Sequence, residues 1–183
     1  DVPEDGFTVT FRFLAPASLP AGTSFGLFSI VDGILGSNDS TANIMLEDGN
    51  ITAELNGTSI ESSGLNLVDG QWHHVGYVFG TDEDGQRLYI DGVLRGSEDT
   101  QKRSDLISQT GIAIGFARSA ANPHFRGILD DVRIWEDDLT AGMVAADVSS
   151  VRTDDLIGRW SFDEGDSDYA YDTSPGNHSG WLG

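Results

Sequence analysis

The stretch at residues 127–135, which reads GILDDVRIW, constrains the fold of this chain more than any other segment. Its alternating pattern predicts a β-strand and not a helix. In regular alternation Ile128, Asp130 and Val132 share one face of the strand, and the opposite face is also largely apolar. We therefore expect a strand covered on both sides, with Asp130 pointing toward the core. A buried carboxylate is costly unless it is paired, hydrogen-bonded or bound to a metal, so Asp130 needs a specific partner.

Short apolar or alternating segments recur along the whole chain at near-regular spacing. Expected strands lie at residues 7–13, 24–31, 44–46, 51–55, 59–67, 73–79, 87–90, 112–114 and 127–135. Asp-Gly steps at residues 48–49 and 91–92 predict tight hairpin turns between neighbouring strands. The one plausible helix spans residues 139–146, with Thr140 as its N-cap. This pattern predicts an all-β fold, a sandwich of two antiparallel sheets with one short helix.

Charge and length narrow the function classes. The 183 residues carry 30 acidic and 10 basic side chains, a net charge of −20, and Lys102 is the only lysine. Nucleic acid is therefore not an expected partner, because phosphate binding needs clustered Lys and Arg. No apolar run approaches membrane-spanning length, so membrane insertion is not expected. Cysteine is absent, and the redox compartment cannot be inferred from disulfides.

Three motifs carry a family resemblance. Residues 70–75 (GQWHHV), 88–93 (LYIDGV) and 125–135 (FRGILDDVRIW) resemble, in the same order, segments of laminin-G-like, concanavalin A-like lectin and glucanase domains, to which pentraxins are related. The resemblance implies a two-sheet jelly-roll β-sandwich, often stabilised by calcium and used mainly to bind sugars or proteins. It also implies an extracellular or cell-surface location.

The tail carries a fourth motif. Residues 156–165 (LIGRWSFDEG) and 171–180 (YDTSPGNHSG) resemble a segment that opens the domain in many family members. We expect residues 1–183 to form a single domain in which residues 156–183 complete the sandwich; the alternative is that they begin a following repeat. The chain starts without Met and without a signal peptide, so we expect it to be one module among other domains of a longer protein.

Two sets of oxygen-bearing side chains are candidate sites. Calcium prefers six to eight oxygen ligands from carboxylates, amides, carbonyls and water. The buried-carboxylate argument and the resemblance together suggest a calcium site, whose predicted ligands are Asp130, Asp163, Asp172 and Asn177. The alternative is that Asp130 pairs with an Arg and that Asp172 hydrogen-bonds the amides of its own turn.

A second set lies on loops, where related laminin-G modules place a calcium ligand at the rim. By this resemblance we predict a calcium-assisted ligand-binding site at Asp39, Asn43 and Asn122, and the alternative is a solvated polar loop. A competing hypothesis places the ligand on a sheet face, with aromatics such as Tyr77 or Tyr89.

Histidine and tryptophan allow further interpretations. His73 and His74 are adjacent strand residues that point to opposite faces, so they cannot chelate one ion together, and a structural role is expected. Core packing is the default for Trp72, Trp135 and Trp160. Trp181 near the end is the tryptophan most free to stack on a sugar.

We therefore expect a non-catalytic, extracellular binding or adhesion module that binds a glycan or a peptide with calcium. A calcium-stabilised spacer without its own ligand is the alternative. A glycoside hydrolase is less favoured, because hydrolysis needs two carboxylates flanking the scissile bond, and the Glu-x-Asp-x-x-Glu strand typical of hydrolases of this fold is absent from the sequence. The ligand itself cannot be read from the sequence.

Overall fold

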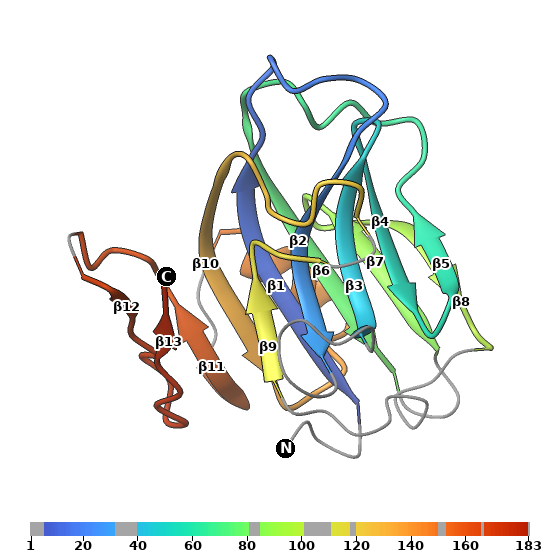
Figure 1. Ribbon diagram of the computed structural model, residues 1–183. Coiled ribbons are helices and arrows are strands. Elements are labelled where there is room, and N and C mark those ends of the chain that lie inside the picture. The colour runs from blue at the N-terminus through green and yellow to red at the C-terminus, as the bar shows by residue number, and fades with distance from the viewer. Residues whose placement is uncertain are drawn as a thin grey trace.

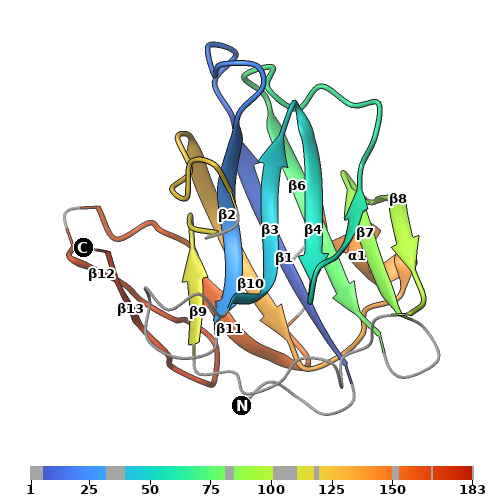
Figure 2. The same ribbon diagram turned by 45° about the vertical axis from the view of Figure 1, so that its right-hand side comes forward.

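The computed structural model describes residues 6–31, 40–80, 85–100, 111–117, 120–149, 153–165 and 167–182. Two antiparallel sheets lie face to face, and a two-stranded hairpin stands beside them (Figure 1). One short helix packs behind the larger sheet (Figure 2). The all-β sandwich predicted from the alternating segments is confirmed.

The larger sheet has six strands drawn from both ends of the chain. In order across the sheet they are β11 (Leu156–Trp160), β10 (Ile128–Trp135), β1 (Phe7–Leu14), β6 (Trp72–Phe79), β7 (Gln86–Ile90) and β8 (Val93–Glu98). β1 lies inside this sheet, between β10 and β6, and its odd-numbered residues from Phe7 to Phe13 are fully buried. β6 also lies inside this sheet, between β1 and β7.

The smaller sheet has five strands, in the order β5 (Thr58–Glu61), β4 (Asn50–Leu55), β3 (Ser40–Glu47), β2 (Ser24–Val31) and β9 (Gly111–Ile114). Asp48 and Gly49, which join β3 to β4, have φ angles of 47° and 79°. Both lie in the left-handed region that a tight hairpin turn requires, as the Asp-Gly step predicts. The strand expected at residues 59–67 is shorter than predicted, because β5 ends at Glu61.

The main core lies between the two sheets. Inward-facing aromatic and aliphatic side chains of β1, β2, β3, β4, β6 and β7 form one continuous apolar cluster, which also takes in Val132 of β10 and Trp160 of β11. On one side of the sandwich β5 and β8 come close together: a Cβ atom added to Gly96 would lie 3.2 Å from the carbonyl oxygen of Glu61. The opposite side, between β9 and β11, is more open and is described with the site below.

A second layer covers the outer face of the six-stranded sheet. The helix α1 (Ala141–Asp147) begins where predicted, and the hydroxyl of its N-cap Thr140 accepts the N–H of Met143 at 3.4 Å. Val144 packs so closely on the sheet that a Cβ added to Gly76 would meet its side chain at 2.6 Å. The described residues include no helix long and apolar enough to cross a membrane.

Ionic contacts also fix the helix to the sheet. The carboxylate of Asp147 lies 3.2 Å from Nε2 of His74 and 2.8 Å from the guanidinium of Arg133, and all three side chains are at most 3% exposed. Arg133 also pairs with Asp131 at 2.6 Å. The histidine beside this network, His73, instead contacts the ring of Phe13 on the other side of β6. The expectation that the two histidines point to opposite faces is therefore confirmed, and their structural role stays a prediction.

The tail continues along the free edge of β11. The N–H of Thr173 donates to the carbonyl of Arg159 at 2.9 Å, and Trp160 forms an isolated bridge with Asp172. The chain then closes the hairpin of β12 (Tyr169–Ala170) and β13 (Gly180–Trp181), which lies beside β9 and β11 in both views (Figures 1 and 2). Whether residues 156–183 belong to this domain alone or also open a repeat stays a prediction.

Candidate functional site

The strand that carries Asp130 departs from regular alternation. Pairing between β1 and β10 shifts register between Thr10 and Arg12, and Asp131 has a φ of 52°, which marks a β-bulge. Beyond the bulge, Asp130 lies opposite Arg12, whose guanidinium donates to the carbonyl of Val148 on the outer face of the sheet. Asp130 therefore shares the outer face and is only partly buried. The prediction that it points into the core is wrong.

The surroundings of Asp130 still affect its charge. Partial burial, together with the nearby carboxylates of Asp131 and Asp163, raises the pKa of Asp130 above its ordinary value, although Arg12 acts against this. Asp163 itself is exposed. These two predicted ligands are thus close enough to influence each other.

Asp172, the third predicted ligand, has its oxygens occupied by backbone amides. One oxygen accepts the N–H groups of Arg159 and Ser174, each at 2.8 Å, and the other accepts the N–H of His178 at 2.7 Å. Burial acts to raise the pKa of Asp172, but these hydrogen bonds outweigh it and the net shift is downward. This is the turn-amide arrangement that was the alternative to metal binding.

The four predicted ligands therefore do not fit a calcium ion as one set. Asn177 is exposed, with a φ of 51°, in the turn beside Asp172. Within the described ranges, no three or more His, Asp or Glu side chains come together in a way that could hold a metal ion. Calcium binding at Asp130 and Asp163 remains a prediction.

The predicted rim site is not assembled as expected. Asp39 lies outside the described residues. Asn122 donates its side-chain amide to the carbonyl of Ser24, at the start of β2, whereas Asn43 lies opposite Ser29 near the end of the same strand. Four residues of extended strand separate Phe25, which bridges to Asn122, from Ser29, a distance of roughly 13 Å. Asn43 and Asn122 therefore do not converge on one ligand.

Asn43 is nevertheless chemically unusual. It is buried on the outer face of the five-stranded sheet, and its Oδ1 has no hydrogen-bond partner among the residues that the structure describes; the same holds for Oγ of Ser29 across the ladder. Buried polar atoms normally have partners, so this pair could accommodate a water molecule or a ligand hydroxyl. The role of Asn43 in ligand binding stays a prediction.

The competing aromatic positions are not available for binding. Tyr77 is fully buried and its hydroxyl donates to the side chain of Gln86, while Tyr89 packs in the cluster under α1. Trp135 and Trp160 are buried as expected, but Trp72 is 46% exposed, which corrects the expectation that it packs in the core.

A long groove opens on the side of the sandwich between β9 and the tail. It has a volume of about 1640 Å³. Its walls are β9, the segment following β9, β11 and the terminal hairpin, and its ring-bearing side chains are Phe116, His124, Trp160, Phe162, His178 and Trp181. Glu136 and Ser179 add polar oxygens. A concave site lined by aromatic side chains with a few polar groups is typical of small-molecule and cofactor sites.

Local structure holds these rings in place. The indole N–H of Trp160 donates to the carbonyl of His178 at 3.0 Å, which ties the tail to β11. Phe116 and His124 pack edge to face, with ring centroids 5.2 Å apart. Phe162 has a φ of 53°, a conformation uncommon for a bulky residue and often found at functional sites.

The terminal hairpin exposes two aromatic side chains, of which Trp181 lines the groove. Trp181 is 73% exposed, and its cross-strand partner Tyr169 is 51% exposed. Directly paired residues project from the same face of a ladder, so both side chains leave the hairpin on the same face. Its position near the end of the sequence predicts that Trp181 is the tryptophan most free to stack on a sugar. The other groove residues were missed, because they come together only through the placement of the terminal hairpin.

Fold and groove together define a β-sandwich of the lectin type with an aromatic groove on its open side. The chain belongs to the concanavalin A-like lectin/glucanases superfamily, whose Laminin_G_3 model matches residues 1–145. The tail that forms β11 and the terminal hairpin lies outside the matched residues. No curated protein matches the chain.

Solved structures share the fold at low identity. A heptameric SAP-like pentraxin from Limulus polyphemus has a TM-score of 0.62 and 23% identity, over 81% of this chain and 72% of the pentraxin. A Bacteroides ovatus protein, provisionally named a carbohydrate binding protein, has a TM-score of 0.68 and 13% identity over 97% of this chain. The match covers 52% of that protein, so this chain spans about half its length. The CBM40 domain of the Ruminococcus gnavus IT-sialidase, also solved with α2,3-sialyllactose, has a TM-score of 0.60 and 15% identity over 80% of this chain and 84% of that one.

Proposed function

We propose that this domain is a non-catalytic module that binds glycans in the groove between β9 and the terminal hairpin. The single observation that carries the proposal is the highly exposed Trp181 in the lining of an aromatic groove, with the exposed Tyr169 as its cross-strand partner on the terminal hairpin. Large exposed apolar patches mark binding sites, and Trp and Tyr offer rigid contact area at a low cost in side-chain entropy. The C–H faces of a sugar ring can pack on these rings while its hydroxyls reach His124, His178 and Glu136.

The lining favours binding over hydrolysis. Glycoside hydrolysis commonly uses two carboxylates flanking the scissile bond. Among the described residues that line the groove, Glu136 is the one carboxylate. The fold relatives whose names refer to carbohydrate binding support the same interpretation, as does the lectin family to which the chain belongs. An extracellular or cell-surface location within a larger protein is part of this proposal.

The test is a glycan array followed by calorimetry with each hit. Trp181→Ala and Tyr169→Ala should each weaken binding about tenfold or more, the factor that corresponds to a loss of about 1.4 kcal/mol. Trp72→Ala is the matched control, because Trp72 is also a half-exposed tryptophan but does not line the groove. Equal loss in the control variant would contradict the assignment of the groove.

Other outcomes would support the alternatives. Binding only to extended peptides, with protection of the β9 amides from exchange, would indicate a strand-recognition module. Binding to neither glycans nor peptides would favour the spacer role. Release of reducing sugar that Glu136→Gln abolishes would make the domain a hydrolase.

A further inference from the structure

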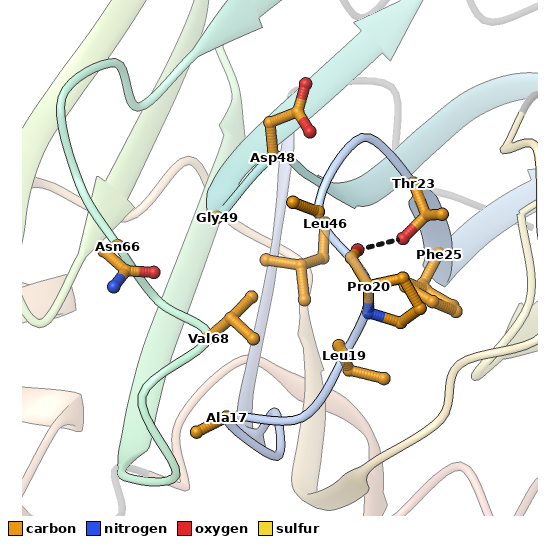
Figure 3. A pocket seen from close by; sticks show the side chains of 11 residues that line it. Ala17, Leu19, Pro20, Thr23, Phe25, Leu46, Asp48, Gly49, Asn66 and Val68 are labelled. Carbon is orange, nitrogen blue, oxygen red and sulfur yellow. Dashed lines mark hydrogen bonds between the residues drawn. The ribbon is translucent and has the colours of Figure 1, made fainter.

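A second cavity lies at the end of the sandwich formed by the loops at residues 15–23 and 62–71 and the β3–β4 turn (Figure 3). Its volume is about 390 Å³, within the range of roughly 300–1,000 Å³ usual for small-ligand pockets. Its walls include Leu19, Phe25, Leu46 and Val68, and its polar side chains include Asp48 and Asn66. None of its lining residues lines the aromatic groove, so the two sites are independent.

Hydrogen bonds connect the three rim segments into a closed ring. The N–H of Gly22 donates to Oδ1 of Asp48 at 2.6 Å, which joins the first loop to the turn. The N–H of Leu67 donates to the carbonyl of Gly49 at 2.8 Å, which joins the turn to the second loop. The N–H of Gly70 donates to the carbonyl of Ala15 at 3.0 Å and returns to the first loop. A rim held in this way is organised before a ligand arrives, which lowers the entropy cost of binding.

The depth of the cavity is apolar. Leu46 and Phe25 are at most 3% exposed, so they form a buried floor, and Val68 and Leu19 stand beside them in Figure 3. A ligand must therefore carry an apolar body that replaces water on this floor.

The polar chemistry of the cavity selects the sign of the ligand's charge. Among the described residues that line it, Asp48 is the one charged residue, and none is Lys, Arg or His. Oδ1 of Asp48 is committed to Gly22, while Oδ2 has no hydrogen-bond partner among the described residues. The amide oxygen of Asn66 points toward the interior of the pocket in Figure 3. With a net charge of −20 on the chain, the cavity attracts cations and repels anions.

We propose that this cavity is a binding site for a small organic ammonium ion. The apolar body of the ligand, about the size of one six-membered ring, packs on Leu46, Phe25 and Val68. Its protonated amine donates to Oδ2 of Asp48, and a charge-assisted hydrogen bond of this kind is stronger than a neutral one.

Three probes of the same ring size test the proposal by amide NMR titration of the uniformly labelled protein. Cyclohexylamine, which is protonated at neutral pH, should shift the amides of Gly22, Gly49 and the Asn66 side chain. Cyclohexanol should bind at least several-fold more weakly, and cyclohexanecarboxylate should cause no shift there. Equal binding of the three probes, or no binding of the amine up to its solubility limit, would overturn the assignment.

Asp48→Asn removes the charge but keeps an acceptor for Gly22, and asparagine tolerates the φ of 47° at this position. The variant should bind the amine about tenfold more weakly, the factor that corresponds to about 1.4 kcal/mol. Asp155→Asn is the matched control, since Asp155 is also an exposed turn aspartate, with a φ of 61°, and does not line the cavity. It should bind as wild type does; equal weakening in both variants would mean that net charge alone attracts the amine. Displacement of the amine by calcium at millimolar concentration would identify a metal site and would also overturn the proposal.

Discussion

The substitution Asp147→Asn tests the buried ionic network that holds α1 on the six-stranded sheet. One oxygen of Asp147 lies 2.8 Å from Arg133, the other lies 3.2 Å from His74, and the Asp147 side chain is 1% exposed. Removal of one partner from a buried ion pair typically costs about 3–5 kcal/mol, because the remaining charge stays buried without compensation. Asn keeps the shape and one acceptor, and Arg133 keeps Asp131, so we expect a loss near the lower limit, about 3 kcal/mol.

Urea denaturation at pH 7 measures this loss directly. For a chain of this size, each kcal/mol shifts the melting temperature by roughly 2–4 °C, so the variant should melt about 6–12 °C below wild type. Asp138→Asn is the matched control, because Asp138 pairs with Arg87 at 3.6 Å and both side chains are over 20% exposed. A pair of this exposure contributes about 1 kcal/mol or less.

The effect should also depend on pH in one direction. Burial acts to raise the pKa of Asp147. The hydrogen bond from His74 and the charge of Arg133 lower that pKa by more than burial raises it, so the folded-state pKa lies below its ordinary value. A depressed pKa contributes stability that is present above the unfolded value, about 3.9, and is lost as the pH falls through the folded value. The gap between wild type and Asp147→Asn should therefore stay constant from pH 7 to 5 and narrow below about pH 4. A loss no larger than that of Asp138→Asn, or a gap that widens in acid, would refute the role assigned to this network.

Three further outcomes are expected. Gly26→Ala should destabilise the fold by about 1–3 kcal/mol in urea, because the new Cβ would lie 1.9 Å from the backbone nitrogen of Ala117; unchanged stability would mean that this loop can move away. Asp172→Asn should cost about 2–3 kcal/mol at pH 7, since it weakens charge-assisted bonds to three amides, and the loss should shrink in acid because the pKa of Asp172 is lowered on folding. Calcium should stabilise wild type by about 2.7 kcal/mol at a hundredfold excess over Kd and so raise its melting temperature, and Asp130→Asn should abolish the increase. An unchanged calcium response in that variant would place the ion elsewhere.

Strands and turns of this protein are predictable from sequence because local patterns specify them. The alternation at residues 7–13 and the Asp-Gly steps depend on side chains within a few positions of one another. The predicted direction of Asp130 failed for the same reason, since a single bulge at Asp131 reverses the faces of every residue before it. Nothing in the sequence of β10 alone signals that bulge.

Sites depend instead on register and on distant packing. Asn43 and Asn122 both contact β2 or its neighbours, but only the ladder positions show that they lie at different ends of the strand. Trp72 belongs to a strand whose later residues are buried, yet it begins β6 at the edge of the core and remains half exposed. The groove could not be predicted without the position of the terminal hairpin, and the two-residue strands of that hairpin carry no pattern that indicates where it packs.

The central place of β1 has a consequence for how the protein is made. Thr8 pairs on one side with Val78 of β6 and on the other with Trp135 of β10, so β1 is synthesised well before either of its two partner strands. At roughly 5–20 residues per second, several seconds of translation separate β1 from β10. During that time the apolar face of β1, from Phe7 to Phe13, has no sheet to join, and non-local pairing of this kind is slow even after synthesis. The nascent chain therefore exposes an unpaired, aggregation-prone strand early. The yield of folded protein in a cell should depend on chaperones more than the stability of the folded state suggests.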